Sequence, residues 1–185
     1  MCKRILVFTS IVLVFIFISG CKVKKIDAQT NGFFDQIKGL WSGQLIIQNA
    51  NGKTTQIPMS LTVLETASDS ILTWTITYDK QTPRSYSIHA INTTKGIYEI
   101  DEQNGIKIPA FCIGNELITN YEVMGNHMTV IYDLLSPNEM TFKVNMWKNN
   151  NGQITGDTVY HGDTIPRVVT YMPMVYQVGK LKKKK

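Results

Sequence analysis

Apolar and polar residues alternate along most of the chain from Trp41 onward, which is typical of β-strands with one buried face. The clearest alternating runs are Ile57-Met59-Leu61-Val63, Leu72-Trp74-Ile76-Tyr78, Leu117-Thr119-Tyr121-Val123, Met128-Val130-Tyr132-Leu134 and Met140-Phe142-Val144-Met146. A helical period is absent from this part of the sequence. The pattern therefore predicts an all-β domain.

Turn-forming residues between these runs set the number of strands. Nine such segments follow one another, at 51–52, 67–69, 81–83, 92–96, 104–105, 114–115, 125–126, 136–138 and 151–152. The first, the fifth and the last are Asn-Gly pairs, which tolerate the positive φ angles of tight hairpins. Nine turns separate ten strands, and their short spacing leaves no room for crossover helices, so the sheet is expected to be an antiparallel meander. A sheet this wide curls, and closure into an up-and-down barrel of roughly ten strands removes its exposed edges.

Three features depart from this simple alternation. A short helical turn is expected before the first strand, because four apolar residues recur there at helical spacing: Phe33, Phe34, Ile37 and Leu40. Pro58 and Pro109 lie inside predicted strands and cannot donate to a ladder, so each should mark a bulge, a barrel end or a gap between strands. The residues after Tyr160 are expected to form an extended stretch packed on the barrel.

The start of the chain has the features of a bacterial export signal. Lys3 and Arg4 precede an apolar run over residues 5–18 that is too short for a permanent bilayer-spanning helix. The run ends at Ile18-Ser19-Gly20-Cys21, which resembles the lipobox of bacterial lipoprotein precursors. An ordinary secretory signal is the alternative interpretation.

The lipobox resemblance implies a covalent lipid anchor. In that family the signal is removed before the cysteine, here Cys21, whose thiol receives a diacylglycerol that holds the protein on a membrane of the cell envelope. Lys22, where a retained lipoprotein would carry Asp, implies the outer rather than the inner membrane in a bacterium that has both. We therefore expect a signal peptide at 1–20, a lipidated tether at 21–32, one barrel domain at 33–179 and a basic tail at 180–185.

The positive net charge of +5 belongs to the two ends of the chain. Ten of the 19 Lys and Arg residues lie in 1–25 or 180–185, which leaves nine against 14 Asp and Glu in between. An acidic body is not expected to bind nucleic acid. The terminal lysines either are solvated or lie against anionic lipid headgroups. Cys112 has no partner for a disulfide once Cys2 and Cys21 are accounted for, and it is expected to be a small buried residue.

The segment Gly39-Leu40-Trp41, which follows a helical turn and precedes an antiparallel meander, resembles the calycin group of lipocalins, fatty-acid-binding proteins and their bacterial relatives. Thr119-Asn120-Tyr121 is similar to a second lipocalin motif, with Asn in place of Asp. The resemblance is architectural and covers about residues 33–160. It implies that Trp41 plugs the closed end of the barrel under a basic side chain, for which Arg167 is the candidate.

Sequence motifs of catalysis are lacking. His89, His127 and His161 are far apart, and the sequence contains no CxxC, HExxH, GxSxG or phosphate-binding glycine loop. Asp101 and Glu102 adjoin a turn, where solvated charges are expected. We therefore expect no enzyme, no metal site and no cofactor.

The aromatic residues on the predicted strands either fill the core or line a cavity, since ten strands enclose more space than side chains readily fill. We expect Trp74, Tyr121, Tyr132 and Phe142 to bind a ligand. The first functional hypothesis is a membrane-anchored barrel that binds a small apolar or amphipathic molecule, or presents its surface to an envelope protein. The second is a protein-binding module with a filled barrel, such as an inhibitor or an assembly accessory. The third is a haem-binding barrel with one of the three histidines as axial ligand.

Overall fold

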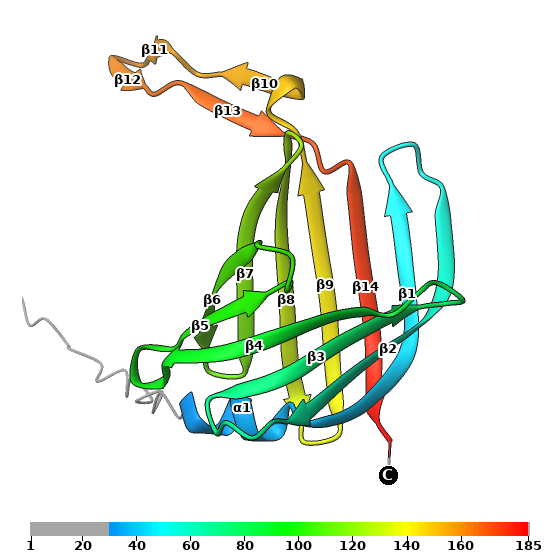
Figure 1. Cartoon of the computed structure of the whole chain (residues 1–185). Helices are drawn as coiled ribbons and strands as arrows, with labels where there is room; N and C mark the ends of the chain where they lie inside the picture. Colours follow the sequence, from blue (N-terminus) through cyan, green and yellow to red (C-terminus); the bar gives the residue numbers. More distant parts are fainter. Residues whose placement is uncertain (1–29, 185) are drawn as a thin grey trace, which may run out of the picture.

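The computed structural model describes residues 30–184 and shows a closed antiparallel β-barrel (Figure 1). Its ten strands are β1 (Gly39–Asn49), β2 (Thr54–Glu65), β3 (Ile71–Tyr78), β4 (Arg84–Asn92), β5 (Ile97–Asp101), β6 (Lys107–Ile113), β7 (Glu116–Val123), β8 (Asn126–Ser136), β9 (Glu139–Trp147) and β14 (Val175–Lys183). Each strand pairs with its neighbours in sequence, and β14 closes the barrel between β9 and β1. The predicted all-β meander of ten strands is therefore confirmed. The predicted signal at 1–20, Cys21 and most of the tether lie outside the described residues.

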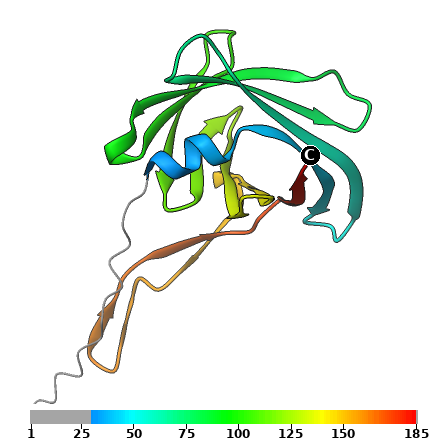
Figure 2. The ribbon, with the colours of Figure 1, turned by 90° about the horizontal axis from the view of Figure 1, so that it is seen from below.

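A short helix covers one end of the barrel, as expected. Helix α1 (Thr30–Gln36) lies across the lower opening, and Figure 2 shows it from below. Phe33 and Ile37 are fully buried, and the ring of Phe34 stacks on that of Tyr98 with centroids 5.7 Å apart. Leu40, in contrast, lies in β1 and is largely exposed. Two apolar side chains of the helix, together with Ile37 directly after it, therefore cap the barrel.

Trp41 forms the plug above this helix. Its side chain is fully buried, and its Nε1 donates to the Ile37 carbonyl over 2.7 Å. The Lys183 ammonium lies 4.8 Å from the ring centroid and donates to the Gln36 carbonyl over 2.8 Å. Burial lowers the pKa of Lys183. The arrangement has the geometry of a cation–π contact at the closed end.

The prediction that Arg167 covers Trp41 is wrong. Arg167 is an exposed residue between β12 (Asp163–Ile165) and β13 (Val168–Tyr171), two strands outside the barrel. The basic partner is Lys183, which the last barrel strand places beside Trp41 in direct register. Pairing across β1 and β14, rather than distance along the chain, therefore selects the cation.

The predicted basic tail is also wrong for most of its length. Lys180, Lys182 and Lys183 belong to β14. Leu181 between them is buried inside the barrel, whereas Lys180 and Lys182 are exposed on its outer face. Here β14 also approaches β1 closely, because a Cβ on Gly43 would clash with the Lys180 carbonyl oxygen. The segment is thus an amphipathic strand whose outward positions are lysines.

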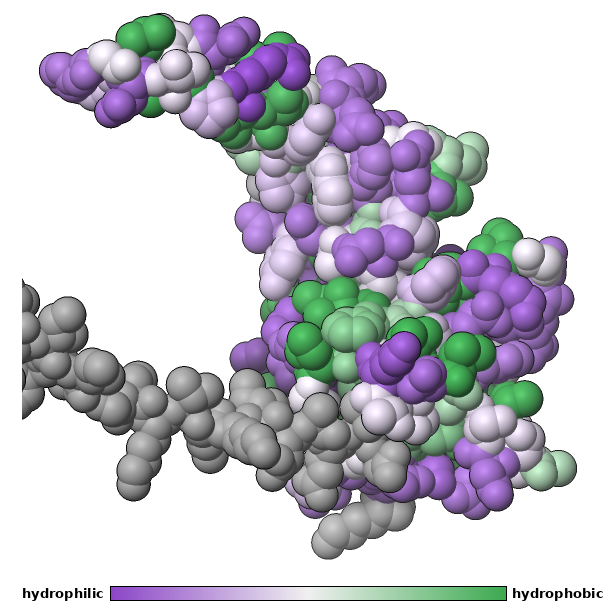
Figure 3. Space-filling view, turned by 90° about the vertical axis from the view of Figure 1, so that its left-hand side faces the viewer, coloured by the Kyte–Doolittle hydropathy of each residue, from purple (hydrophilic) through white to green (hydrophobic). Residues whose placement is uncertain are grey.

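Between β9 and β14 the chain leaves the barrel and forms a long two-stranded ribbon (Figure 1). After η2 (Asn149–Asn151), β10 (Gly152–Thr155) pairs with β13, and β11 (Thr158–Tyr160) pairs with β12. The sequence pattern predicted a tenth barrel strand and a stretch packed on the barrel here. That prediction is wrong because Gly152 has a φ of −70° and makes no tight hairpin back to the sheet. Apolar side chains are exposed along the ribbon (Figure 3).

Candidate functional site

The half of the barrel away from α1 contains a cavity of about 290 Å³, and all ten barrel strands contribute to its wall. This volume lies near the lower end of the range of ligand pockets. Ten strands enclose a wider interior than eight do, and Gly179 contributes no side chain at the level of Phe142. The expectation that space remains inside the barrel is confirmed.

The wall of the barrel is lower on one side, where two prolines lie. The β6–β7 ladder begins at Ala110, directly after Pro109, and the β2–β3 ladder begins at Met59, directly after Pro58. At Pro109 the β6–β7 ladder has ended, whereas Pro58 is still bonded to the residue after β3, because Asp79 N–H donates to the Pro58 carbonyl over 2.8 Å. The upper half of β7 has no β6 partner as a result. Of the three predicted outcomes, Pro109 marks a gap between strands and Pro58 marks the end of the β2–β3 ladder.

Three aromatic side chains form the floor of the cavity. Trp74 contacts Tyr132 edge to face with centroids 4.8 Å apart, and the Tyr132 and Phe142 rings are 5.0 Å apart. These residues lie on β3, β8 and β9, and all three are buried. Two positions further down the same strands, Leu72, Leu134 and Met140 are fully buried in the core below. We call Trp74, Tyr132 and Phe142 the aromatic floor.

A polar group at this floor lacks a partner. Trp74 is 0% exposed, and its Nε1 has no hydrogen-bond acceptor. Burial raises the pKa of Tyr132 well above its ordinary value. The nearby Trp74 indole lowers this pKa only in part, and the two side chains do not form a hydrogen bond of good geometry. An unpaired buried donor of this kind costs about 1–3 kcal/mol. An acceptor bound in the cavity would recover part of that cost.

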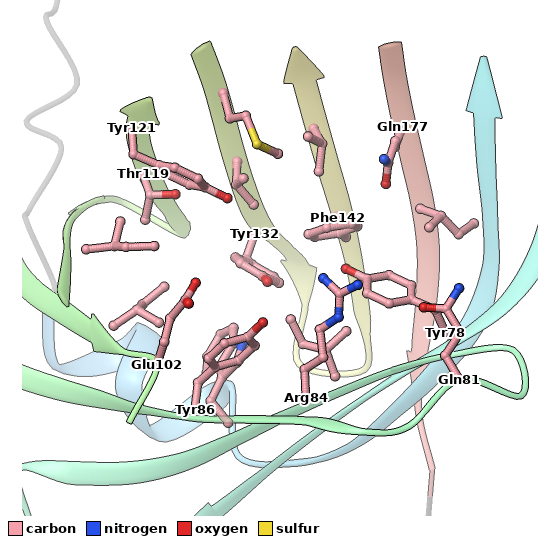
Figure 4. A pocket seen from close by; sticks show the side chains of 18 of the residues that line it. Tyr78, Gln81, Arg84, Tyr86, Glu102, Thr119, Tyr121, Tyr132, Phe142 and Gln177 are labelled. Carbon is pink, nitrogen blue, oxygen red and sulfur yellow. The ribbon is translucent and has the colours of Figure 1, made fainter. Parts of the chain in front are cut away.

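The rim of the cavity is polar (Figure 4). The guanidinium of Arg84 lies 5.7 Å above the ring of Tyr78. Burial raises the pKa of Tyr78 to about 12, although Arg84 opposes the shift, and burial likewise raises the pKa of Tyr121. The rim hydroxyls are therefore neutral donors and acceptors at ordinary pH. Glu102, also on the rim, accepts a hydrogen bond from the Asn104 amide over 3.2 Å.

All four predicted ligand-binding residues line this cavity: Trp74, Tyr121, Tyr132 and Phe142. Sequence reasoning missed Arg84 and treated Glu102 as an ordinary solvated charge. Both continue an inward-facing alternation, since Arg84 precedes Tyr86 by two residues and Glu102 follows Ile100 by two. This period was the available signal, and it was overlooked because each residue lies at the end of a strand or in the adjoining turn.

The histidines do not reach the cavity. His89 shares a 2.8 Å hydrogen bond with the Ser87 hydroxyl, His127 stacks on Trp147, and His161 lies at the end of the ribbon beside Tyr160. None of the three lines the cavity, so the geometry does not support the hypothesis of a histidine-ligated haem inside the barrel. Within residues 30–184, no group of three His, Cys, Asp or Glu side chains is placed to hold a metal ion.

Cys112 is buried, as predicted. Burial raises the pKa of its thiol to about 11, so the thiol is protonated at neutral pH.

None of the helices in the described part of the chain has the length and apolar character needed to cross a bilayer.

Comparison with known proteins informs the fold. No family model matches the sequence, and no curated protein matches it. The S-type phycobiliprotein lyase CPES from Guillardia theta is similar in structure, with a TM-score of 0.58 and 8% identity over 89% of this chain and 98% of that chain. A protein of unknown function from the DUF3598 family of Nostoc punctiforme has a TM-score of 0.56 and 8% identity over 82% of this chain. The match covers 49% of that protein, so the present chain spans about half of its length.

These comparisons correct the expectation that the protein is not an enzyme. That expectation was based on the lack of local catalytic motifs, and it is contradicted because a lyase has a barrel of the same fold. Side chains from different strands can converge at a barrel mouth without forming a motif in the sequence, as Arg84, Glu102 and Tyr121 do here. The chain thus has a closed ten-stranded barrel that resembles the lipocalin-like fold of the phycobiliprotein lyase.

Proposed function

We propose that this protein is a lipid-anchored barrel that binds a small amphipathic molecule in the cavity above the aromatic floor. The observation that carries this proposal is the cavity itself, which is lined by apolar side chains and by polar groups in similar measure, with hydroxyl and charged groups at its rim. An apolar body fits between Ile57, Ile76 and Val144, while polar groups of the ligand meet the rim. Such a division of the surface selects molecules that are apolar at one part and polar at another.

The lyase neighbour suggests one specific candidate within this class. A bilin-like linear tetrapyrrole combines apolar rings with carbonyl and carboxylate groups, as the cavity requires. Such a molecule is larger than a cavity of about 290 Å³ and would extend through the mouth beyond Tyr121. Smaller amphipathic molecules would fit within the barrel.

The dye 1-anilinonaphthalene-8-sulfonate tests the binding proposal when titrated into residues 22–185, which keep every described residue. We expect one dye per chain. Val144→Trp places a ring in the cavity, so it should weaken dye binding at least about tenfold without loss of stability. Leu134→Ala, which opens the packed core away from the cavity wall, should lower the free energy of unfolding by about 2–5 kcal/mol and leave dye affinity unchanged. If the dye does not bind, or if Val144→Trp leaves its affinity unchanged, the proposal is contradicted.

The proposed anchor is Cys21, which lies outside the described residues. Helix α1 starts at Thr30, so only residues 22–29 separate the proposed lipid from the closed end of the barrel. Changing Cys21 to Ala should remove the acyl acceptor, and the protein should leave the membrane pellet or accumulate uncut. Membrane fractionation and the mass of the processed chain measure this. Unaltered processing and fractionation would rule out the lipid anchor.

The ribbon favours a second candidate function, the binding of an envelope protein. Its exposed apolar side chains include Ile154, Val159, Tyr160 and Met172, and exposed patches of this kind commonly mark interaction sites. Its two-stranded sheets also have free edges. If the dye fails to bind, this function replaces ligand binding as the best supported one.

A further inference from the structure

The aromatic floor contains a hydrogen-bond donor without an acceptor, in surroundings that exclude charge. Trp74 Nε1 is buried and unpartnered, the Tyr132 ring contacts the indole, and Tyr86 lies opposite Trp74 on β4. Arg84 and Glu102 are the charged residues among those that line the cavity, and both lie at the rim (Figure 4). A carboxylate or ammonium group at the floor would therefore lose its hydration without gaining an opposite charge. The floor suits a neutral acceptor.

The two charged residues of the rim differ in what they already contact. Glu102 accepts a hydrogen bond from Asn104, and Tyr86 lies between it and Arg84 (Figure 4). Arg84 is exposed, lies over the Tyr78 ring, and forms no ion pair with any described carboxylate. The guanidinium is therefore available to an anionic group that approaches from the open end.

We propose that the ligand is an anionic amphiphile with a neutral oxygen acceptor at its apolar end, which accepts from Trp74 Nε1 while its anionic group meets Arg84. This inference rests on the proposed function, because it assigns the chemical class and the orientation of the molecule in that same cavity. It excludes a simple fatty acid that enters carboxylate first. It favours molecules with a carbonyl at one end and a carboxylate at the other.

Two matched probes test the inner contact. Decanoate and 9-oxodecanoate have the same number of carbons, and only the second carries a ketone near its apolar end. Isothermal titration of residues 22–185 gives the ratio of their dissociation constants. Trp74→Phe keeps an aromatic ring but removes the N–H. We therefore expect it to weaken the binding of 9-oxodecanoate relative to that of decanoate by about three- to tenfold. Tyr121→Phe, which removes a rim hydroxyl, is the matched control and should leave the ratio unchanged.

A second measurement does not depend on a variant that folds. The chain contains three tryptophans, so its indole N–H groups give three resolvable NMR signals. The Trp74 signal should move downfield with 9-oxodecanoate and stay nearly unchanged with decanoate. A variant tests the outer contact. Arg84→Gln should weaken the binding of decanoate and of 9-oxodecanoate by the same factor, about three- to tenfold, and leave the binding of uncharged decanol unaltered.

The outcomes separate this inference from the proposed function. If neither acid nor decanol binds, the proposed function fails and the inference fails with it. If the acids bind but the ratio is the same in wild type and Trp74→Phe, and no indole signal responds to the ketone, the inference is overturned while the proposed function stands. If Arg84→Gln weakens the binding of decanol and of decanoate equally, the assigned orientation of the ligand is overturned.

Discussion

Replacing Trp41 by alanine is expected to lower the free energy of unfolding by about 3–5 kcal/mol, the range measured when buried aromatic residues are truncated in other proteins. The ring is fully buried at the closed end of the barrel. Its loss would leave a void, break the Nε1 bond to the Ile37 carbonyl and deprive the Lys183 ammonium of the aromatic face that it covers. Urea unfolding followed by circular dichroism measures the effect.

Trp147 is the matched control for this substitution. It lies on the outer face of β9, where it stacks on His127 and is only partly buried. Trp147→Ala should therefore cost much less than Trp41→Ala. A loss under about 1 kcal/mol for Trp41→Ala, or equal losses for the two variants, would show that Trp41 does not serve as the plug of the barrel.

Ending the chain at Gly179 is expected to prevent stable folding. This truncation removes Leu181, which is buried between β1 and β9, together with the ladder bonds on both sides of the lower half of β14. Lys183 and its contact with Trp41 are lost as well. The summed cost is on the order of 5 kcal/mol or more, which is comparable to the whole stability of a small domain. Soluble yield and thermal unfolding of the truncated chain measure it.

A charge variant distinguishes the contribution of strand β14 to stability from that of its exposed lysine charges. Lys180→Gln combined with Lys182→Gln keeps β14 and removes two exposed charges, of which only Lys182 contacts a carboxylate, at 3.7 Å from Glu139. We expect a change below about 1 kcal/mol, because exposed ion pairs contribute little. A truncated chain that unfolds like the wild type would restore the original expectation of a dispensable basic tail.

The fold was largely predictable because its signals are local. Alternation with a period of two identifies the strands of a barrel, and Asn-Gly pairs such as Asn51-Gly52 and Asn104-Gly105 do form turns with Gly at positive φ. The last strand was missed because Lys180, Lys182 and Lys183 give its sequence the composition of a solvated tail. The ribbon was missed because an extended hairpin has the same local pattern whether it joins the barrel or projects from it.

The site was predictable only where it continues the core. Trp74, Tyr132 and Phe142 face inward by simple alternation, so sequence reasoning placed them correctly on the cavity wall. Arg84 and Glu102 lie at the ends of β4 and β5, which pair with each other as a hairpin, so continuing the same alternation past each regular run would have placed them at the mouth. Lys183 rather than Arg167 covers Trp41 because β14 pairs with β1, and pairing between distant strands is not visible in a local pattern.

A crystal structure of residues 22–185 with 1-anilinonaphthalene-8-sulfonate tests the central claim, ligand binding in the barrel, most directly. We predict the aromatic rings of the dye above Trp74 and Phe142, with the sulfonate toward Arg84. A dye found only on the outer surface, for instance along the ribbon between β10 and β13, with the cavity filled by rearranged side chains, would contradict the account.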